Sequence, residues 1–573
     1  MKVVCDIETD AIKATTIHCI VCKDIEDNKV YSFYGDTLND FIDFSKNITE
    51  YIGHNFLSFD APVLFKLLGV TISAKQITDT LILSQLDKPD REGGHSLKSW
   101  GERLKDNKIS FDSFEYFTKE MLEYCIQDVD VCHKIYVHLN KKLSNYSSIS
   151  IRMEHTIRAI VNQQQENGFY FNYSEANIFT AKLTQLMEGV KDEVHKTMQP
   201  LAQPIKEVIP VYKKDGTLSM RNLKCLGDMG TSVAGPFTSL KFEEFNLGSR
   251  QQIAKQLMHK GWKPTKFTEK GSIIVDETVL EKVDLPEAQL IYRYLLLQKR
   301  IAQLNNWLSA YNHDTGCIHG RVITLGANTN RMTHRNPNVA QTPANHSEYG
   351  EECRQLFTVP TDRLLVGCDA SGLELRCLAH YMDDNDFTNE LLEGDIHTAN
   401  QKMAKLETRD QAKTFIYALI YGAGPAKMGK IVGKGKQAGQ QMIHNYLEAV
   451  PALRILRKKI DKASASGLIK AIDGRLLNIR SKHSALNTLL QGMGAIVCKY
   501  WLIEIMKRIH KHKLNAKLVG SIHDEYQFDV STDDASAFAI HTNEAIKDVE
   551  INLALRCPLD SDYKIGKNWK ETH

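Results

Sequence analysis

The sequence predicts a multidomain α/β protein. Its 573 residues are too many for one hydrophobic core and suggest roughly three or four domains of about 100 to 200 residues each. The hydrophobic fraction of 42% and the charged fraction of 25% are typical of a globular protein. Over residues 1–145, short β-branched runs alternate with helical stretches, so we expect the chain to open with a compact α/β domain.

Three apolar runs predict strands in this first domain, at residues 3–7, 18–22 and 30–34. Cys19 and Cys22 form a C-x-x-C pattern, but no second pair follows at the spacing of a zinc site, so we interpret them as strand residues. The other cysteines are scattered, which is typical of reduced thiols. No run approaches the length of a membrane span and no apolar leader is present, so we expect no membrane partner and a cytoplasmic location.

A helical pattern follows over residues 149–196. Prolines and an Asp215-Gly216 turn signal then indicate an irregular or hairpin insertion over residues 198–245. Ser249 and Gln252 stand at the spacing of a capping box, which predicts that a helix restarts there.

The first predicted strand ends on two acids. In "KVVCDIETD", Asp6 and Glu8 are two residues apart, so their side chains leave the strand on the same face and could share a divalent cation. The pattern is weak evidence by itself, since many strands end on acids that serve only solubility.

Two later stretches strengthen the interpretation of this pair as part of a metal site. Asp60 follows a turn and precedes an apolar helical run, and Tyr124 and Asp128 are four residues apart, hence on one face of a helix. Several carboxylates and a tyrosine can hold two hard cations through oxygen ligands. One cation activates a water, and the other stabilises the leaving oxygen of a phosphodiester.

A second acidic cluster is predicted far downstream. The apolar run 364–368 ends on Asp369, and "KLVGSIHDEYQFDV" predicts two short strands joined at a turn that exposes Asp524 and Glu525. If the two strand ends meet, these acids form another two-metal site, suited to nucleotidyl transfer.

Between these acids, Arg409, Lys413, Tyr417 and Tyr421 recur every four residues. On an α-helix each lies about 6 Å further along the axis, turned by about 40°, so the four form a ladder about 18 Å long. The cationic end suits a triphosphate and the aromatic end suits a base or ribose. An ordinary amphipathic helix with a basic face is the alternative. Apolar side chains on the opposite face would pack the helix down: Ala412, Phe415 and Leu419.

The positive charge of the chain is concentrated in two stretches. Residues 402–436 carry a net +6 and residues 451–482 a net +7, so the rest of the chain carries −11 against a total of +2. A basic region in an otherwise acidic protein is expected when the partner is a polyanion such as a nucleic acid. A solvated charged face is the alternative.

These motifs together resemble two known families. The order D-x-E, N-x4-D, Y-x3-D resembles the DEDD-type 3′→5′ exonucleases that have tyrosine in the last motif. R-x3-K-x3-Y-x3-Y-G, "DASGLELR" and "HDE" resemble motifs B, A and C of the family A (Pol I-like) DNA polymerases. Phrases such as "THRNPNVAQTP", "GDIHT" and "SALNTLLQGMGAIVCK" are similar to the replicative branch found in T-seven-like short-tailed phages, and the similarity extends to the closing "GKNW".

The resemblance implies a fold and its boundaries. A ribonuclease H-like 3′→5′ exonuclease domain would occupy residues 1–145, followed by a right-hand polymerase. The thumb would span residues 146–310, including the insertion at about 198–245. The palm would comprise residues 311–390 and 481–573, and the fingers residues 391–480.

The resemblance also implies metal ligands. Asp369, Asp524 and the Ala370 carbonyl would hold two Mg²⁺ ions in the polymerase site, with Glu525 close by. In the exonuclease site Tyr124 would orient the attacking water, and four acids would hold two Mg²⁺ ions: Asp6, Glu8, Asp60 and Asp128. Mn²⁺ is expected to substitute at both sites.

Further positions match residues of the family that contact the substrates. Glu374 would crowd a ribose 2′-OH and so favour dNTPs. Arg409, Lys413 and His397 would bind the triphosphate. Tyr417 would pack near the sugar, and Tyr421 would stack at the template side. Four residues would face the minor groove of the primer-template DNA, where correct pairs present acceptors in similar places: Arg331, Gln341, Gln491 and His523.

The resemblance implies partners as well as substrates. A phage replisome would supply a helicase-primase and a processivity factor, in the cytoplasm of a bacterial host. The stretch 198–245 is shorter than the basic insertion that recruits host thioredoxin in T-seven-like enzymes and lacks its dense lysine runs, which leaves thioredoxin recruitment open. "GKIVGKGKQ" has the wrong spacing for a Walker A loop, so we expect no ATPase.

Two other functions compete with a proofreading DNA polymerase. A single-subunit RNA polymerase shares the palm and fingers arrangement, but Glu374 and the N-terminal nuclease motifs argue against it. A non-catalytic primer-template clamp is disfavoured because every acid of both clusters is present.

Overall fold

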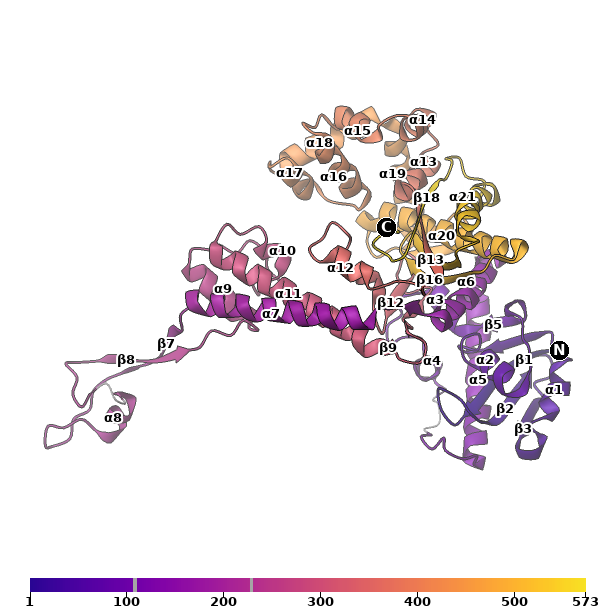
Figure 1. Ribbon diagram of the computed structural model, residues 1–573, viewed down its shortest axis with the longest axis horizontal. Coiled ribbons are helices and arrows are strands. Elements are labelled where there is room, and N and C mark those ends of the chain that lie inside the picture. The colour runs from indigo at the N-terminus through magenta and orange to yellow at the C-terminus, as the bar shows by residue number, and fades with distance from the viewer. Residues whose placement is uncertain (107–110, 227–229) are drawn as a thin grey trace. The chain divides into compact units, whose positions relative to one another are not determined.

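The computed structural model describes residues 1–106, 111–226 and 230–573 (Figure 1). The chain divides into two compact units. The first combines Met1–Phe171 with Ala310–His573, and the second is Asn172–Ser309. Both predicted acidic clusters therefore belong to the first unit.

The N-terminal part of the first unit is built on a mixed five-stranded sheet in the order β3-β2-β1-β4-β5 (indigo in Figure 1). β1 (Lys2–Thr9) is central, with β2 (Ile17–Asp24) and β3 (Val30–Tyr34) antiparallel on one side. β4 (Glu50–Gly53) and β5 (Ile77–Asp79) continue in parallel on the other side. The three strands predicted from the sequence are confirmed within β1, β2 and β3.

Helices surround this sheet: α1 (Asp40–Ser45), α2 (Asp60–Leu68), α3 (Thr80–Asp87), α4 (Leu97–Leu104) and α5 (Lys119–Lys142). α5 packs against β1 and β2 through a small apolar cluster that includes Val4, Val21 and Val129. All twelve cysteines are free thiols, and Cys19 and Cys22 are buried in β2, as the interpretation of the C-x-x-C pattern as strand predicts.

The second sheet of this unit is antiparallel, in the order β16-β17-β13-β18. Its strands are β13 (Arg363–Ala370), β16 (Ala516–Ile522), β17 (Glu525–Ser531) and β18 (Ser561–Gly566). β16 and β17 form the predicted hairpin, and β13 pairs with β17 so that Asp369 stands opposite Glu525. The pairing brings the two distant acidic segments to the same end of one sheet.

Seven helices follow β13: α13 (Leu373–Met382), α14 (Asn385–Glu393), α15 (Ile396–Ala404), α16 (Arg409–Ile420), α17 (Pro425–Ile431), α18 (Lys436–Ala449) and α19 (Pro451–Ala463). α16 is the predicted ladder helix, and it begins after Thr408, whose side chain accepts a hydrogen bond from the Gln411 amide. Its expected packing face is confirmed, because Ala412, Phe415 and Leu419 are buried.

Two long helices pack near the second sheet and against each other: α20 (Ala485–His512) and α21 (Ala535–Asn552). The segment Lys482–His512 is long and apolar enough to cross a membrane, with a mean hydropathy of 1.3, but 78% of its apolar window is buried inside the protein. It is packed as a core helix is.

Further elements of the first unit lie between these parts. They are α6 (Ser148–Asn167), α12 (Gly350–Gln355), and the strands β6 (Phe169–Tyr170), β9 (Tyr311–Asn312), β10 (Cys317–Ile318), β11 (Arg321–Ile323), β12 (Thr333–Arg335), β14 (Leu468–Lys470) and β15 (Leu476–Asn478). β14 and β15 form a hairpin whose turn contains Asp473 and Arg475.

The continuous helical pattern predicted over residues 149–196 is wrong at its middle. α6 ends at Asn167, and Gly168 adopts a left-handed φ of +66° before β6 pairs with β10. A Cβ at Gly168 would stand 2.7 Å from the Cys317 Cβ, so the close approach of β10 requires glycine there.

The second unit contains α7 (Tyr173–Thr197), α8 (Met220–Leu226), α9 (Arg250–His259), α10 (Glu277–Leu280) and α11, which extends over Pro286–Ala310. Within 198–245, β7 (Leu201–Val208) and β8 (Phe237–Glu243) pair as an antiparallel ribbon, and residues 227–229 lie outside the described residues. Ser249 caps α9 as predicted, but the Gln252 side chain accepts its hydrogen bond from the Asn246 amide, so the reciprocal bond of a capping box goes to another residue.

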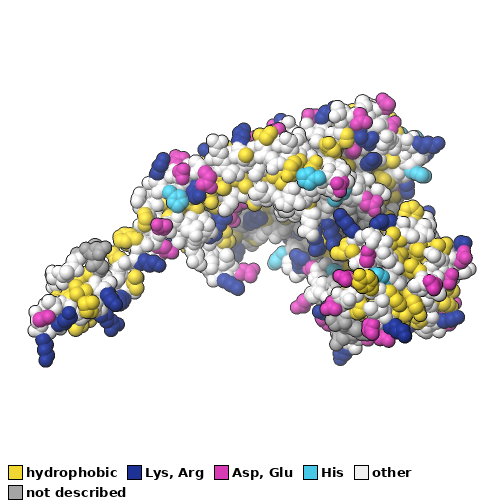
Figure 2. Space-filling model, turned by 60° about the horizontal axis from the view of Figure 1, so that its bottom comes forward, with side chains coloured by type: hydrophobic (Ala, Val, Ile, Leu, Met, Phe, Trp, Pro, Cys, Tyr) yellow, Lys and Arg dark blue, Asp and Glu magenta, His cyan; other side chains and the backbone are white. Residues whose placement is uncertain are grey.

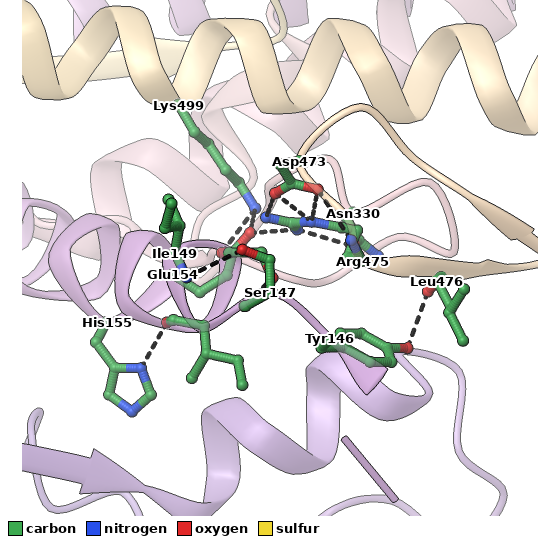
Figure 3. A network of polar contacts seen from close by, with 12 residues as sticks. Tyr146, Ser147, Ile149, Glu154, His155, Asn330, Asp473, Arg475, Leu476 and Lys499 are labelled. Carbon is green, nitrogen blue, oxygen red and sulfur yellow. Dashed lines mark hydrogen bonds and ion pairs between the residues drawn. The ribbon is translucent and has the colours of Figure 1, made fainter. Parts of the chain in front are cut away.

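A buried ionic network joins α6, α20 and the β14–β15 turn (Figure 3). Arg475 lies 2.5 Å from a Glu154 carboxylate oxygen and 2.8 Å from Asp473, and the Lys499 ammonium lies 2.8 Å from Glu154. All four side chains are at most 1% exposed. Two cations and two carboxylates balance, which is the condition for burying charge without a large cost.

We predict that Arg475→Met destabilises the first unit by about 3 to 5 kcal/mol, because it leaves Asp473 buried without its cation. Thermal unfolding followed by circular dichroism measures the effect. The matched control is Arg480→Met, since Arg480 forms an ion pair with Asp90 at 3.0 Å that is largely exposed and contributes little. Equal falls in the melting temperature of the two variants would contradict the prediction.

Candidate active sites

The acids of the second sheet converge at one sheet end. Asp369 is the next-to-last residue of β13, Asp524 lies in the β16–β17 turn, and the Ala370 amide donates to the Asp524 carbonyl at 3.2 Å. Partial removal from water and the charges of Asp524 and Glu525 raise the pKa of Asp369 to about 7, although its side chain keeps an exposed edge. Partial burial also raises the pKa of Asp524.

Glu525 differs from its two neighbours. Its Oε1 accepts hydrogen bonds from Trp569 Nε1 at 2.6 Å and Gln527 Nε2 at 2.5 Å, and His573 Nδ1 lies 2.8 Å from Oε2. Burial alone would raise the pKa of Glu525, but these contacts and the charge of His573 hold it below its usual value. Glu525 therefore stays ionised and adds negative charge beside Asp369. Sequence reasoning missed Trp569 and His573, because neither belongs to an acidic motif.

This donor set fits a hard divalent cation. Asp369 and Asp524 offer carboxylate oxygens and Ala370 offers a carbonyl oxygen, which are the ligands that Mg²⁺ prefers. Besides burial, the charges of Asp524 and Glu525 raise the pKa of Asp369, and a bound cation would offset their repulsion.

The cationic end of the ladder helix faces α15. The Arg409 guanidinium donates to both carboxylate oxygens of Asp395, at 2.7 and 3.1 Å. Asp395 also caps α15 by accepting from the His397 amide at 3.1 Å. Arg409 and His397 therefore share a contact with Asp395. Partial burial lowers the pKa of His397, and the charges of Arg409 and Lys413 lower it further. Sequence reasoning did not identify Asp395, although "GDIHT" contains it.

The aromatic end of the ladder meets Glu374. The Tyr421 hydroxyl lies 2.9 and 2.7 Å from the two Glu374 carboxylate oxygens, and Arg331 donates to Oε1 at 3.2 Å. The rings of Tyr417 and Tyr421 are stacked with centroids 6.5 Å apart. Burial raises the pKa of Tyr417, and the charges of Glu374 and Asp524 raise it further.

The residues predicted to face DNA are only partly brought together. Arg331 and His523 line one crevice, together with Lys499 and Ser521. His523 is exposed in the β16–β17 turn. Outside the crevice, Gln491 lies half-buried on α20, and Gln341 is exposed at the end of the short 3₁₀ turn Val339–Gln341.

The basic stretches of the sequence lie on the helices after β13 and on the segment that leads into α20. Arg457 and Lys482 line a cavity beside the end of the ladder helix, next to Gly422. Positive charge therefore borders the predicted site, as binding of a polyanion requires.

The N-terminal acids form the second candidate site. Asp6, Glu8 and Cys125 place one potential ligand atom each within 4.8 Å of the others. Asp60 Oδ1 accepts a hydrogen bond from the Ile7 amide at 3.2 Å, so Asp60 adjoins both acids of β1. Burial, reinforced by the charge of Asp6, raises the pKa of Asp60 well above its usual value. The acids again fit a cation, and Cys125 was not predicted.

The last two predicted residues of this site come from α5. Tyr124 and Asp128 are both buried, and Asp128 lies three residues after Cys125, on the same face of the helix. The Cys125 thiol lies 3.6 Å from the Asp6 carbonyl, so this face of α5 meets the acidic end of β1. The Tyr124 ring packs against Phe111, with centroids 5.4 Å apart.

Comparisons with known proteins agree with the resemblance seen in the motifs. The family model described as DNA polymerase family A matches residues 228–571. The chain is 33% identical to the DNA-directed DNA polymerases of Enterobacteria phage T3 and Escherichia phage T7, over 706 and 707 aligned positions that cover 100% of each chain. The structure of a POL domain of Pol1 from M. smegmatis, in complex with DNA primer-template and dNTP, aligns with a TM-score of 0.78. At 17% identity, that alignment covers 100% of this chain and 96% of the other and shows a shared fold.

The raised pKa of Asp369 predicts that divalent cations bind the second-sheet acids more weakly as the pH falls. Below pH 7 the carboxyl holds a proton that the cation must displace, so the affinity should fall about tenfold for each pH unit. Calorimetric titration with Mn²⁺ between pH 5.5 and 8.5 measures this in the Asp6→Ala, Glu8→Ala variant, which removes the other site. Affinity that does not change with pH would contradict the prediction.

Proposed function

This chain belongs to DNA polymerase family A, and we propose that it extends a primer 3′ end with dNTPs on a DNA template and removes mispaired 3′ ends with its N-terminal domain. The observation that carries the proposal is the meeting of Asp369 and Asp524 at one sheet end, next to a helix that presents Arg409, Lys413 and Tyr417 in a row.

Each group in this site has a task in nucleotidyl transfer. Arg409 and Lys413 bind the triphosphate as point charges and hydrogen-bond donors. Asp369, Asp524 and the Ala370 carbonyl would hold two Mg²⁺ ions, for which Mn²⁺ would substitute. When bound, these ions supply Lewis-acid activation of the 3′-OH and of the reacting phosphate. His397 adds a neutral donor beside the phosphates.

Glu374 supports a preference for DNA synthesis over RNA synthesis. Tyr421 and Arg331 hold its carboxylate in place, next to the stacked Tyr417 ring, where an incoming sugar would lie. A ribose 2′-OH there would meet a fixed charged side chain. The single-subunit RNA polymerase is therefore disfavoured, and the complete set of acids disfavours a non-catalytic clamp.

We infer that the N-terminal cluster is a 3′→5′ exonuclease site. Asp6, Glu8, Asp60 and Asp128 would hold two Mg²⁺ ions, which supply Lewis-acid activation of a water. Tyr124 would orient that water. The closeness of Asp6, Glu8 and Asp60 at the end of β1 supports this assignment.

The two activities should be separable by mutation. Asp369→Ala should abolish primer extension and leave digestion of a mismatched 3′ end intact, because the exonuclease acids are untouched. Asp6→Ala with Glu8→Ala should have the converse effect. Gel assays on one labelled primer-template, with matched and mismatched ends, measure both reactions, and extension that survives Asp369→Ala would overturn the assignment of the polymerase site.

We propose that the β7–β8 ribbon recruits a processivity factor, with host thioredoxin as the first candidate. The tip of the ribbon, at the left of Figure 2, shows hydrophobic and basic side chains together. Ile209, which directly follows the end of β7, is 72% exposed, and Phe242, opposite Ala202 at the other end of the ribbon, is 67% exposed, an unusual exposure for large apolar side chains. The similarity to polymerases of two phages supports action in the host bacterial cytoplasm beside a phage helicase-primase.

Thioredoxin should lengthen the products of single-primer extension on a long single-stranded template. Ile209→Ser with Phe242→Ser should remove the gain without changing synthesis by the polymerase alone, because neither side chain supports a core. Ile551→Ser on α21, 76% exposed, is the matched control and should keep the gain. Product lengths that do not respond to thioredoxin would exclude it as the factor.

A further inference from the structure

The buried ionic network extends to the polymerase site. Its members are Glu154, Asp473, Arg475 and Lys499. The same Arg475 nitrogen that binds Glu154 donates to Asn330 Oδ1 at 2.9 Å (Figure 3). Asn330 is 2% exposed. The residue that follows it is Arg331.

The loop 327–331 is held closely on both of its sides. The Asn330 amide donates to the Ala327 carbonyl at 2.8 Å, and the Ala327 amide donates to the Arg331 carbonyl at 3.2 Å. Asn328 Nδ2 donates to the Asn478 carbonyl at 2.7 Å. The β14–β15 hairpin therefore contacts the loop at two points, through Asn478 and through Arg475. Asn330 adopts a left-handed φ of +59°, a conformation that asparagine tolerates better than most residues.

From Arg331 the connections lead to the nucleotide-binding residues. Arg331 binds Glu374, which also accepts the hydrogen bond of Tyr421. Lys499 lines the same crevice as Arg331 and reaches the network through Glu154. Two side chains of the network therefore lie next to Arg331. Arg475 contacts the preceding residue, Asn330, and Lys499 lines the same crevice.

We propose that Glu154, Arg475 and Asn330 are positioning residues that hold Arg331 in place to read the minor groove of the primer terminus. The inference rests on the proposed polymerase function, in which Arg331 donates to the acceptor that every correct pair presents there. An arginine side chain has many rotamers. A site that recognises the geometry of a base pair needs the side chain that contacts the pair held to within about half an ångström. Arg475, fully buried between two carboxylates, supplies such a rigid support.

The competing explanation is that the network only stabilises the fold. Buried charge networks often have that role alone. The two explanations differ in which substrates they affect. Loss of stability slows every substrate alike, whereas loss of positioning removes only the advantage that comes from the minor-groove acceptor.

The test compares two primers, one ending in dG and one ending in 3-deaza-2′-deoxyguanosine, which lacks only the N3 acceptor. The measured quantity is the ratio of their single-turnover extension rates with the next correct dNTP. The full-length wild-type chain should favour dG by about tenfold or more, the range for a hydrogen bond from a charged donor. Arg331→Ala should bring the ratio close to one.

Asn330→Gly keeps the left-handed turn and removes the amide that Arg475 holds. It should lower the ratio at least threefold, because Arg475 then has no contact with this loop residue. Arg475→Lys is the second variant, since a lysine keeps the charge but cannot bind Glu154 and Asn330 in one plane. It should lower the ratio as well. Asn400→Ala, which removes a fully buried amide bonded to Tyr446 at 2.7 Å, is the matched control and should keep the wild-type ratio.

The outcomes distinguish failure of the proposed role of Arg331 from failure of the proposed role of the network. If Arg331→Ala keeps the wild-type ratio, Arg331 does not read the minor groove, and both its proposed role and this inference fail. If Arg331→Ala abolishes the ratio while Asn330→Gly and Arg475→Lys leave it unchanged and lower only the melting temperature, the network is structural and this inference alone fails.

Discussion

The antiparallel pairing of β13 with β17 is the constraint on which the polymerase site depends. It sets Asp369 opposite Glu525, with Asp524 in the adjoining turn, although the two segments are far apart in the chain. Partial burial raises the pKa of both Asp369 and Asp524, and at Asp369 the charges of Asp524 and Glu525 raise it further. The apolar pairs that flank them, such as Val366 opposite Phe528, supply the burial that holds the strands in register. The fold thus keeps a concentration of negative charge that favours a divalent cation.

Glu374 connects this sheet end to the helices that carry positive charge. One carboxylate accepts from Tyr421 at the end of the ladder helix and from Arg331 in the loop before β12. Any movement of α16 toward or away from the acids must therefore carry Glu374 with it or exchange the Tyr421 hydrogen bond for another. At the other end of the ladder, Asp395 neutralises Arg409. In the proposed function, an incoming triphosphate would compete with that carboxylate, so substrate binding would have to replace contacts at both ends of α16.

Much of this arrangement could be predicted from residues that repeat at fixed spacings. The four-residue period of the ladder located α16 and its buried face, and the acids at strand ends located both clusters. The contacts that hold these residues could not be predicted, because their partners carry no local pattern. His573 and Trp569 reach Glu525 from the last residues of the chain, Asp395 is one acid among many, and Arg475 meets Glu154 only after folding. The sequence does not predict the break after α6, because a single glycine can also stand within a helical pattern. Only the close approach of Cys317 in the folded chain shows why Gly168 must be glycine.

α6 serves both candidate sites through adjacent residues. Glu154 enters the ionic network behind Arg331, while His155 points away from that network (Figure 3) and accepts a hydrogen bond from the Asp79 amide at 2.8 Å. The Asp79 carboxylate in turn accepts from the amides of Asn55 and Leu57, in the turn that leads to Asp60. Burial lowers the pKa of His155, so the ring stays neutral and can accept that bond. Buried contacts on both sides oppose bending of α6. In the proposed function, transfer of a mispaired 3′ end between the sites is then a movement of the DNA strand past a rigid helix.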